Sequence, residues 1–207
     1  MEENLKKVEA WLLEHANKIA TYSLQSGATV QELKELEEEF GDILPDDFKQ
    51  LYLWHNGMSD DENMGNLFYG MEFCSLEKVI RYFRDNKSQK QEKYPLQQVD
   101  RGIDASDIYN ENWIMFGHDG SRTKLYIDLK PTSAGTRGQV IFIDEEAEVG
   151  ILVANSIEEL IEKFVSDLSD GLYELNEDAL EDDEHFLEVD QSVDLVNWSM
   201  SDEWQRE

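Results

Sequence analysis

The sequence predicts an α+β fold in which helices pack against a mostly antiparallel central sheet. Two observations carry this prediction. In several segments between residues 3 and 86, and again after residue 156, apolar residues recur every three or four positions, which is the period of a helix with one buried face. Between residues 113 and 154 short apolar or alternating runs follow one another across turns, which is typical of consecutive antiparallel strands.

The N-terminal half is expected to be helical, with helices over residues 3–20, 29–40, 46–55 and 75–86. Thr29 and Glu32 have the spacing of a capping box, and Gly41 suits the left-handed residue that ends a helix. The third helix begins after Pro45, with Asp46 and Asp47 at the positive end of its dipole, and stops at Asn56-Gly57.

The strands are expected mainly in the second half. The predicted strands cover residues 67–69, 113–116, 124–129, 139–143 and 149–154. Residues 87–111 and 131–138 are predicted to be loops, and residues 144–148 an acidic hairpin turn. Ser156 and Glu159 form a second capping box that opens the closing helix.

Charge and composition exclude several classes of protein. The 207 residues include 47 acidic and 18 basic side chains, a formal net charge of -29, so a free nucleic-acid binder is not expected. No apolar run is long enough to span a bilayer, and the N-terminus lacks a secretory signal. Cys74 is the single cysteine, so no internal disulfide forms and a reducing, cytoplasmic location is expected.

The last fifth of the chain carries about half of the net charge. Residues 167–207 contain 15 acidic residues and one basic residue, Arg206, which predicts a tail that is partly docked or disordered. Trp198 and Trp204 within it are either anchors of a docked segment or aromatics of an interface. The net-positive stretch 78–101 is either a docking site for this tail or a solvated helix face and loop.

The residues do not favour catalysis. No nucleophile motif occurs, and Cys74 is predicted to be a buried structural cysteine without a nearby histidine. A hydrolase or transferase that uses His118 or Asp128 remains an alternative. Asp128 sits in an alternating strand, where it either orders the following loop or contacts a ligand or partner. No metal site is expected, because the four histidines, His15, His55, His118 and His185, lack the spacing of metal ligands. No cofactor and no enzyme activity are expected either.

An ordered set of short motifs runs through both halves of the chain. In the first half these motifs are Ser26-Gly27-Ala28-Thr29, Phe40-Gly41, Leu44-Pro45-Asp46-Asp47-Phe48 and Asn56-Gly57. In the second half they are Trp113, Phe116-Gly117, Leu125-Tyr126-Ile127-Asp128-Leu129, Pro131, Gly138-Gln139-Val140 and Ala154-Asn155-Ser156. In this order these motifs resemble the SUKH superfamily, which is named partly for a fungal regulator of cell-wall assembly and killer-toxin resistance. The resemblance divides the chain into an N-terminal helix (1–25), a SUKH-like domain (26–166) and the acidic tail (167–207).

The resemblance implies a non-enzymatic protein-binding module. The expected function is that of a bacterial immunity protein, which binds and neutralises a cognate toxin, for example a nuclease; the alternative is a regulatory scaffold like the fungal members. The expected partner is a basic protein, with neither nucleic acid nor membrane as a target, and the chain itself is expected to be a monomer or weak dimer. The candidate partner contacts are Asp60, Asp61, Glu62, Asp119, Asp128, Asp144, Glu145, Glu146 and Glu148.

Overall fold

The computed structural model describes residues 1–61, 63–89 and 93–206, with only the backbone at Gln89. The helices are α1 (Glu2–His15), α2 (Val30–Phe40), α3 (Asp46–Trp54), α4 (Leu76–Gln89), α5 (Ile157–Ser169) and α6 (Glu177–Glu181). A π-helix covers Ile19–Ser23, and 3-10 helices cover Phe68–Gly70 and Trp198–Met200. The strands are β1 (Glu72–Phe73), β2 (Gln98–Val99), β3 (Trp113–His118), β4 (Thr123–Asp128), β5 (Gln139–Asp144), β6 (Val149–Ala154), β7 (Tyr173–Leu175) and β8 (Leu187–Val189).

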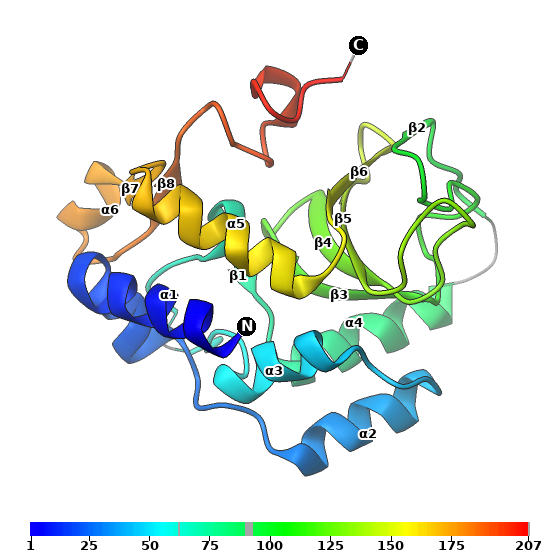
Figure 1. Cartoon of the computed structure of the whole chain (residues 1–207), viewed down its shortest axis with the longest axis horizontal. Coiled ribbons are helices and arrows are strands. Elements are labelled where there is room, and N and C mark those ends of the chain that lie inside the picture. Colours follow the sequence, from blue (N-terminus) through cyan, green and yellow to red (C-terminus); the bar gives the residue numbers. More distant parts are fainter. Residues whose placement is uncertain (62, 90–92, 207) are drawn as a thin grey trace.

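A curved six-stranded sheet has the strand order β1-β3-β4-β5-β6-β2, and most of it lies in the right half of Figure 1. Its neighbours pair antiparallel except β2, which pairs parallel with β6. The four strands β3 to β6 follow one another in sequence, so short connections suffice and the meander forms as the alternation predicts. The α+β prediction is confirmed.

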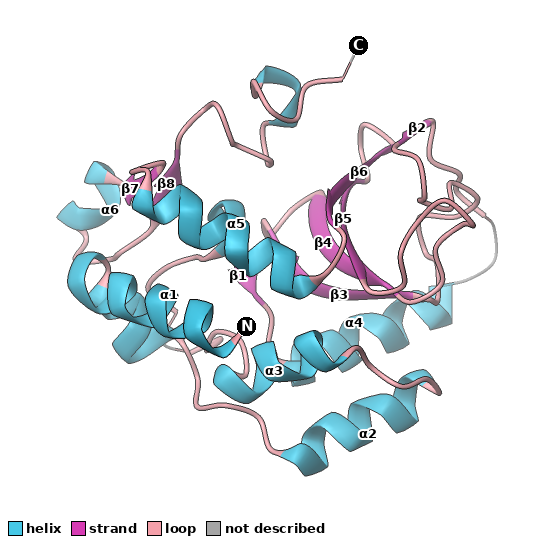
Figure 2. Ribbon diagram, viewed as in Figure 1, coloured by secondary structure: helices cyan, strands magenta, loops and turns pink. Residues whose placement is uncertain are grey.

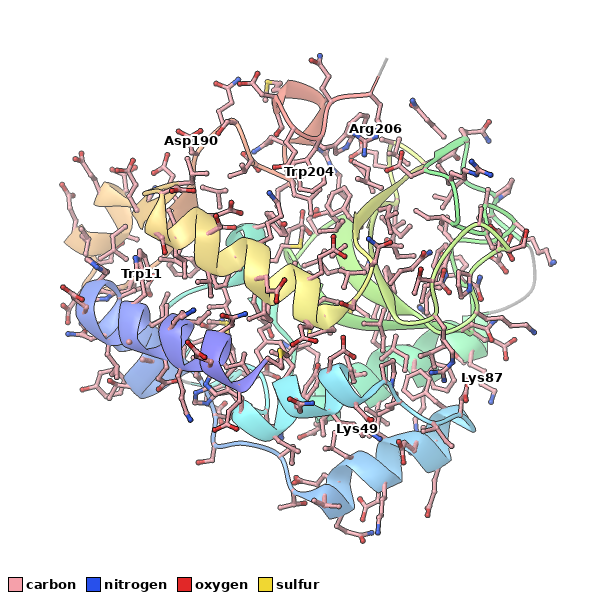
Figure 3. All side chains as sticks on the ribbon, viewed as in Figure 1. Trp11, Lys49, Lys87, Asp190, Trp204 and Arg206 are labelled. Carbon is pink, nitrogen blue, oxygen red and sulfur yellow. The ribbon has the colours of Figure 1, made fainter. Side chains whose placement is uncertain are left out.

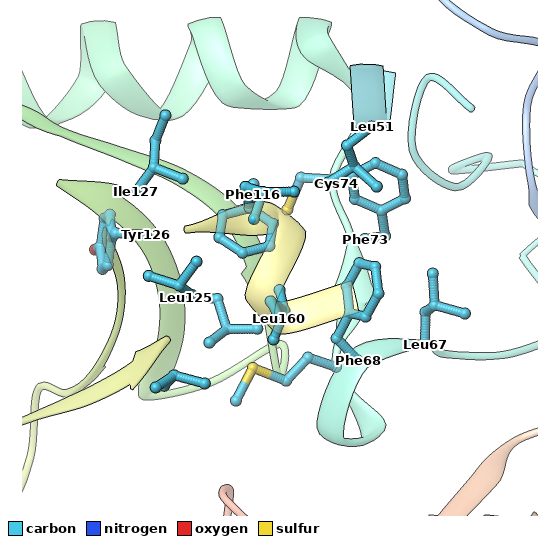
Figure 4. Close-up of a cluster of buried hydrophobic side chains, with 14 of the residues drawn as sticks. Leu51, Leu67, Phe68, Phe73, Cys74, Phe116, Leu125, Tyr126, Ile127 and Leu160 are labelled. Atoms are coloured by element: carbon cyan, nitrogen blue, oxygen red, sulfur yellow. The ribbon is translucent and has the colours of Figure 1, made fainter. Parts of the chain in front are cut away.

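Helices cover one side of this sheet, as Figure 2 shows by colour. Helix α5 lies against β5 and β6, and α1 and α3 pack on α5. The aromatic centre of the core is Phe68, whose ring lies 5.2 Å from Phe164 and 5.7 Å from Phe73 between centroids (Figure 4 shows Phe68 and Phe73). Each such ring contributes about 0.5–1.5 kcal/mol through its aromatic neighbours, beyond the area it buries.

The capping box predicted for α2 is confirmed. The Glu32 N–H donates to Thr29 Oγ1 at 3.2 Å, and the Thr29 N–H donates to the Glu32 carboxylate at 2.7 Å. Gly41 ends the helix in the left-handed region, at φ 71°. Together these contacts satisfy backbone donors that would otherwise lack partners at the helix start, an effect of about 1 kcal/mol.

Three predicted elements differ from the structure. The first helix ends at His15, and the chain continues as a separate π-helix from Ile19. The strand predicted over residues 67–69 is wrong: all three side chains are buried, Tyr69 adopts φ 53°, and the chain turns into a 3-10 helix before the strand at β1. A run that is buried on every side lacks the alternation that would distinguish a strand from a tight turn. The predicted loop 87–111 contains the last residues of α4 and the short strand β2.

The C-terminal tail is folded along residues 167–206. It forms the small β7-β8 sheet with α6 between its strands, and then returns across α5 to the edge of the large sheet (Figure 1). Arg206 pairs with Asp100 at 2.7 Å, and Lys163 of α5 pairs with Glu203 at 2.8 Å. The alternative in which the acidic tail docks on the basic side chains of residues 78–101 is not what the structure shows. Among the described residues no ion pair joins an acid of the tail to one of those side chains, and the ion pair with that stretch is the reverse one, Arg206 with Asp100. Lys90 and Glu92 lie outside the described residues.

Candidate functional site

Several predicted contact residues gather at one end of the sheet, which we call the turn surface: Asp60, Asp119, Glu145, Glu146 and Glu148. Successive antiparallel strands place the β3-β4 and β5-β6 turns at the same end, where the Glu145 N–H donates to the Arg122 carbonyl at 3.0 Å. Asp60 belongs to a separate loop and is held at this end by Lys78. The Lys78 side chain pairs with both Asp60 and Glu72, and Glu72 of β1 lies opposite His118 at the end of β3. Asp61 is exposed beside Asp60, and Glu62 lies outside the described residues.

Basic side chains neutralise most of the turn surface. Asp60 pairs with Lys78 at 2.6 Å, Glu145 with Lys124 at 2.5 Å and Glu146 with Arg122 at 3.0 Å. The exposed Glu148 occupies the left-handed region at φ 57° in the hairpin turn. Three of the five acids of the turn surface are thus paired with a base, so the negative potential at this end of the sheet is partly compensated.

Asp144 is buried, with 1% of its surface exposed, and this corrects its assignment as a partner contact. Its Oδ1 accepts hydrogen bonds from the Glu146 and Ala147 N–H groups, at 3.0 and 2.9 Å. Its Oδ2 accepts one from the Trp198 indole at 3.1 Å. Asp144 thus orders the hairpin turn and attaches the tail to the sheet. Asp119 has a related role, because its carboxylate accepts the Ser121 and Thr123 N–H groups within its own turn.

Asp128 lies at the opposite end of the sheet and is fully buried, so its assignment as a partner contact is also corrected. The hydrogen bonds of Asp128 match the other predicted role, in which this residue orders the loop that follows its strand. Oδ1 accepts the Lys130 N–H at 2.9 Å, Oδ2 accepts the Gln139 amide at 3.1 Å, and the Asp128 carbonyl accepts the Gly138 N–H at 2.7 Å. These bonds hold both ends of the loop 131–138. Burial raises the pKa of Asp128 to about 6.

The raised pKa makes the stability of the protein depend on pH. An unfolded aspartate has a pKa of about 3.9, so between pH 4 and 6 the folded state holds a proton that the unfolded state has lost. The contribution of Asp128 to the free energy of unfolding therefore falls as the pH rises from 4 to 6. We expect Asp128→Asn to reduce this fall by about 1–3 kcal/mol, measured by chemical unfolding at pH 4.5 and 7. Asp61→Asn, an exposed control, should leave the pH profile unchanged.

A cluster of Glu72, Cys74 and His118 is the one group in the described chain with ligand atoms close enough for a metal, within 4.8 Å of one another. The prediction that Cys74 has no histidine nearby is therefore wrong. The cluster does not fit a cation as it stands. Glu72 already pairs with Lys78 at 2.5 Å and with His118 Nε2 at 3.2 Å, and the Gly120 N–H donates to His118 Nδ1, which leaves the proton on Nε2. Burial raises the pKa of the Cys74 thiol well above its ordinary value, so the thiolate that a metal requires is disfavoured.

The strongest uncompensated charge lies in a segment that the sequence-based assignment of contacts did not include. We call residues 170–190 the acidic lobe: they contain ten acidic side chains and no lysine or arginine. Nine of the carboxylates are exposed, namely Asp170, Glu174, Glu177, Asp178, Glu181, Asp182, Asp183, Glu188 and Asp190. Within the described part of the chain, the one cation paired with this lobe is Lys18, with Asp183. The label at Asp190 in Figure 3 marks the end of the lobe, beyond α5.

Two carboxylates of the lobe face each other across the small sheet. Glu174 of β7 is directly opposite Glu188 of β8, and both are exposed. Like charges directly opposite on a sheet destabilise it, so this pair costs stability unless a cation approaches. We expect Glu174→Lys to raise the free energy of unfolding by about 0.2–1 kcal/mol, measured by thermal or chemical unfolding. Glu35→Lys on the exposed face of α2 is the control, and an equal gain there would mean that only the net charge matters.

A groove of about 510 Å³ lies beside the acidic lobe. Its lining combines apolar side chains (Phe186, Val189, Val196 and Ala179) with Glu188 and Asp194. A larger hollow of about 630 Å³ lies between α2 and α4, but Arg81 and Arg84 line it together with Glu32 and Glu77. The groove at the lobe is therefore the hollow that adjoins a surface of a single charge sign.

Comparison with known proteins identifies the family to which this domain belongs. The model of the SMI1/KNR4 family, also called SUKH-1, matches residues 27–163. The chain belongs to the SMI1/KNR4 family. Similar proteins include KNR4/SMI1 homolog 2 of Debaryomyces hansenii (24% identical, 83% of this chain and 36% of the relative). The cell wall biosynthesis/cell cycle regulator smi1 of Schizosaccharomyces pombe is 22% identical over 85% of this chain and 38% of its own length. The glucan synthesis regulatory protein of Neurospora crassa is 24% identical over 85% of this chain and 40% of its own length.

The SMI1/KNR4 domain and the acidic lobe occupy different parts of the chain. The family match ends at residue 163, before the lobe begins, and the chain spans well under half the length of these fungal relatives. No helix among the described residues combines the length and the apolar character needed to cross a membrane. The sequence shows how many acidic residues the tail contains. It does not show that the tail folds so that these residues form one exposed surface, because that fold depends on tertiary contacts.

Proposed function

We propose that this chain is a non-enzymatic protein-binding module with a regulatory role, and that it recognises a partner protein with a basic surface. The observation that carries the proposal is the acidic lobe, where nine exposed carboxylates gather and Lys18 is the one paired cation among the described residues. Family membership supports it, because two of the similar fungal proteins are named as regulators. Neither the names of these relatives nor the geometry supports the toxin-neutralising role that was expected from the sequence. We therefore place the regulatory role first.

The charge arrangement suits recognition of a basic protein. A concentrated field of one sign steers an oppositely charged partner and raises the association rate by about 10-fold to 1000-fold at low salt. The same field repels phosphate backbones, so a nucleic-acid target does not fit. The turn surface contributes less to this field, because three of its five acids are paired with lysine or arginine.

The test compares two variants with the same net charge. One, the α6 variant, neutralises the three acids of α6 and its C-cap residue (Glu177→Gln, Asp178→Asn, Glu181→Gln, Asp182→Asn). The other neutralises four exposed acids on α1 and α2 (Glu3→Gln, Glu14→Gln, Glu35→Gln, Glu38→Gln). Each is expressed in place of the native chain, and partners are captured, identified and quantified at several salt concentrations. We expect the α6 variant to lose its partner and the control to keep it.

Equal retention or equal loss of the partner in the two variants would contradict the proposal. The identity of the partner then separates the two roles. A component of cell-wall synthesis or its regulation supports the regulatory role. A toxin domain against which co-expression of the chain protects cells would restore the toxin-neutralising role.

A further inference from the structure

We propose that the groove beside the acidic lobe binds a basic peptide segment of the partner, with lysine or arginine side chains flanking an apolar residue. This inference rests on the proposed function and names the part of the partner that is recognised. The groove lies along the lobe's small sheet, and seven of its twelve lining residues are apolar or glycine. The apolar side chains of this lining that are only partly buried can contact a bound peptide, namely Ala179, Phe186, Val189 and Val196.

The charges around the groove select the flanking residues of the peptide. Glu188 and Asp194 line the groove directly, and Glu174 stands opposite Glu188 on the neighbouring strand. A lysine or arginine placed near Glu174 and Glu188 would relieve the repulsion between them, while Phe186 and Val196 offer apolar contact to a neighbouring side chain. Charge alone would attract any cation; the apolar lining adds a requirement for an uncharged residue between the cations.

The groove recognises side chains rather than receiving an added strand. The outer edge of β8 is already occupied, because the Asn66 amide donates to the Leu187 carbonyl at 3.1 Å and accepts the Leu187 N–H at 2.7 Å. Asn66 therefore takes the place of a neighbouring strand, and backbone pairing at this position is blocked. Gly70 brings the chain close to β8, because a Cβ there would lie 3.5 Å from Val189 Cγ2.

Two parts of the chain build the groove together. Asn66, Tyr69 and Gly70 belong to the segment that matches the family model, and the other lining residues follow it, from Asn176 to Asn197. Residues 176–197 thus add to the family domain a surface that residues 27–163 do not form by themselves.

The experiment measures binding of fluorescein-labelled synthetic peptides to the full chain by anisotropy. The probe has nine residues, with lysines flanking two central leucines. One control peptide replaces the leucines by serine, and another replaces the lysines by glutamate. The protein variants are Val196→Arg, Val196→Asp and, as a matched control on the exposed face of α2, Val30→Arg. Thermal unfolding of each variant establishes that it is folded.

We expect the lysine-leucine peptide to bind the native chain and Val30→Arg equally, and Val196→Arg at least tenfold more weakly. Val196→Asp, which adds negative charge but removes the apolar contact, should also weaken binding severalfold. The serine peptide should bind more weakly than the leucine peptide, and the glutamate peptide not at all. If the serine peptide binds equally well, or both Val196 variants keep full affinity, the groove is not the site. The same conclusion follows if the leucine peptide does not bind the native chain, and the proposed function then stands or falls on the α6 variant alone.

Discussion

Replacement of Gly57 by alanine is expected to destabilise the protein strongly. Gly57 adopts φ +69°, and a Cβ added to it would lie 2.3 Å from the Ser75 nitrogen and 2.4 Å from the Cys74 carbonyl carbon. Both neighbours are backbone atoms, so relief requires the chain itself to move. We expect a loss of about 3 kcal/mol or more in the free energy of unfolding, equivalent to roughly 6–12 °C in Tm.

Gly120→Ala is the matched control for this prediction. Gly120 also has a positive φ, +81°, but no atom lies within 4 Å of an added Cβ. The substitution should cost about 1 kcal/mol, which is the backbone term alone. If the two variants lost equal stability, the close approach of Gly57 to the start of α4 would not be what requires glycine there.

The second large effect is expected for Trp204→Ala. The Trp204 side chain is 4% exposed, its indole N–H donates to the Val193 carbonyl at 2.9 Å, and its ring meets Tyr69 edge-on at 5.9 Å and Lys163 Nζ at 5.6 Å. Figure 3 shows Trp204 near Arg206, at the point where the tail returns to the domain. Truncation leaves a cavity and an unpaired carbonyl, so we expect a loss of about 3–5 kcal/mol.

The loss should be concentrated in the tail, and amide hydrogen exchange can locate it. We expect faster exchange over residues 191–206 in Trp204→Ala, with the six-stranded sheet less affected. Met200→Ala, which changes a side chain that is 62% exposed, should stay within about 0.5 kcal/mol of the native chain. Unchanged exchange in the Trp204 variant would contradict the role of this residue as the anchor of the tail.

Sequence periodicity predicted strands β3 to β6 of the large sheet well because these four pair with their sequence neighbours. It missed β1 and β2, whose partners β3 and β6 are remote in the sequence. The alternation in residues 124–129 and the acidic turn 144–148 identify β4 and the β5-β6 hairpin before any contact is known. The capping box at Thr29 and the side-chain cap of Ser156 fixed two helix starts, because a cap depends on residues three positions apart. At the second start the Glu159 carboxylate accepts the Asn155 N–H, where a full capping box would use the N–H of Ser156. Local signals sufficed wherever the interaction itself was local.

The candidate site could not be predicted in the same way. Asp128 and Asp144 looked like surface acids in the sequence, and only the loops folded over them show that both are buried. The lobe depends on contacts across the whole chain, such as Lys18 with Asp183 and Asn66 with Leu187. An acidic, apolar-poor segment is usually a solvated tail, and no short-range pattern reveals that strands β7 and β8 pair within it.

The central claim is that a basic partner binds the acidic lobe and its groove, and nuclear magnetic resonance tests it most directly. The lysine-leucine peptide is added to the isotope-labelled native chain, and the backbone amide shifts are followed. We predict shifts concentrated in residues 174–197 and 66–70, reduced at high salt. Shifts centred on the turns at residues 119–122 and 144–148, or on the hollow between α2 and α4, would contradict the claim.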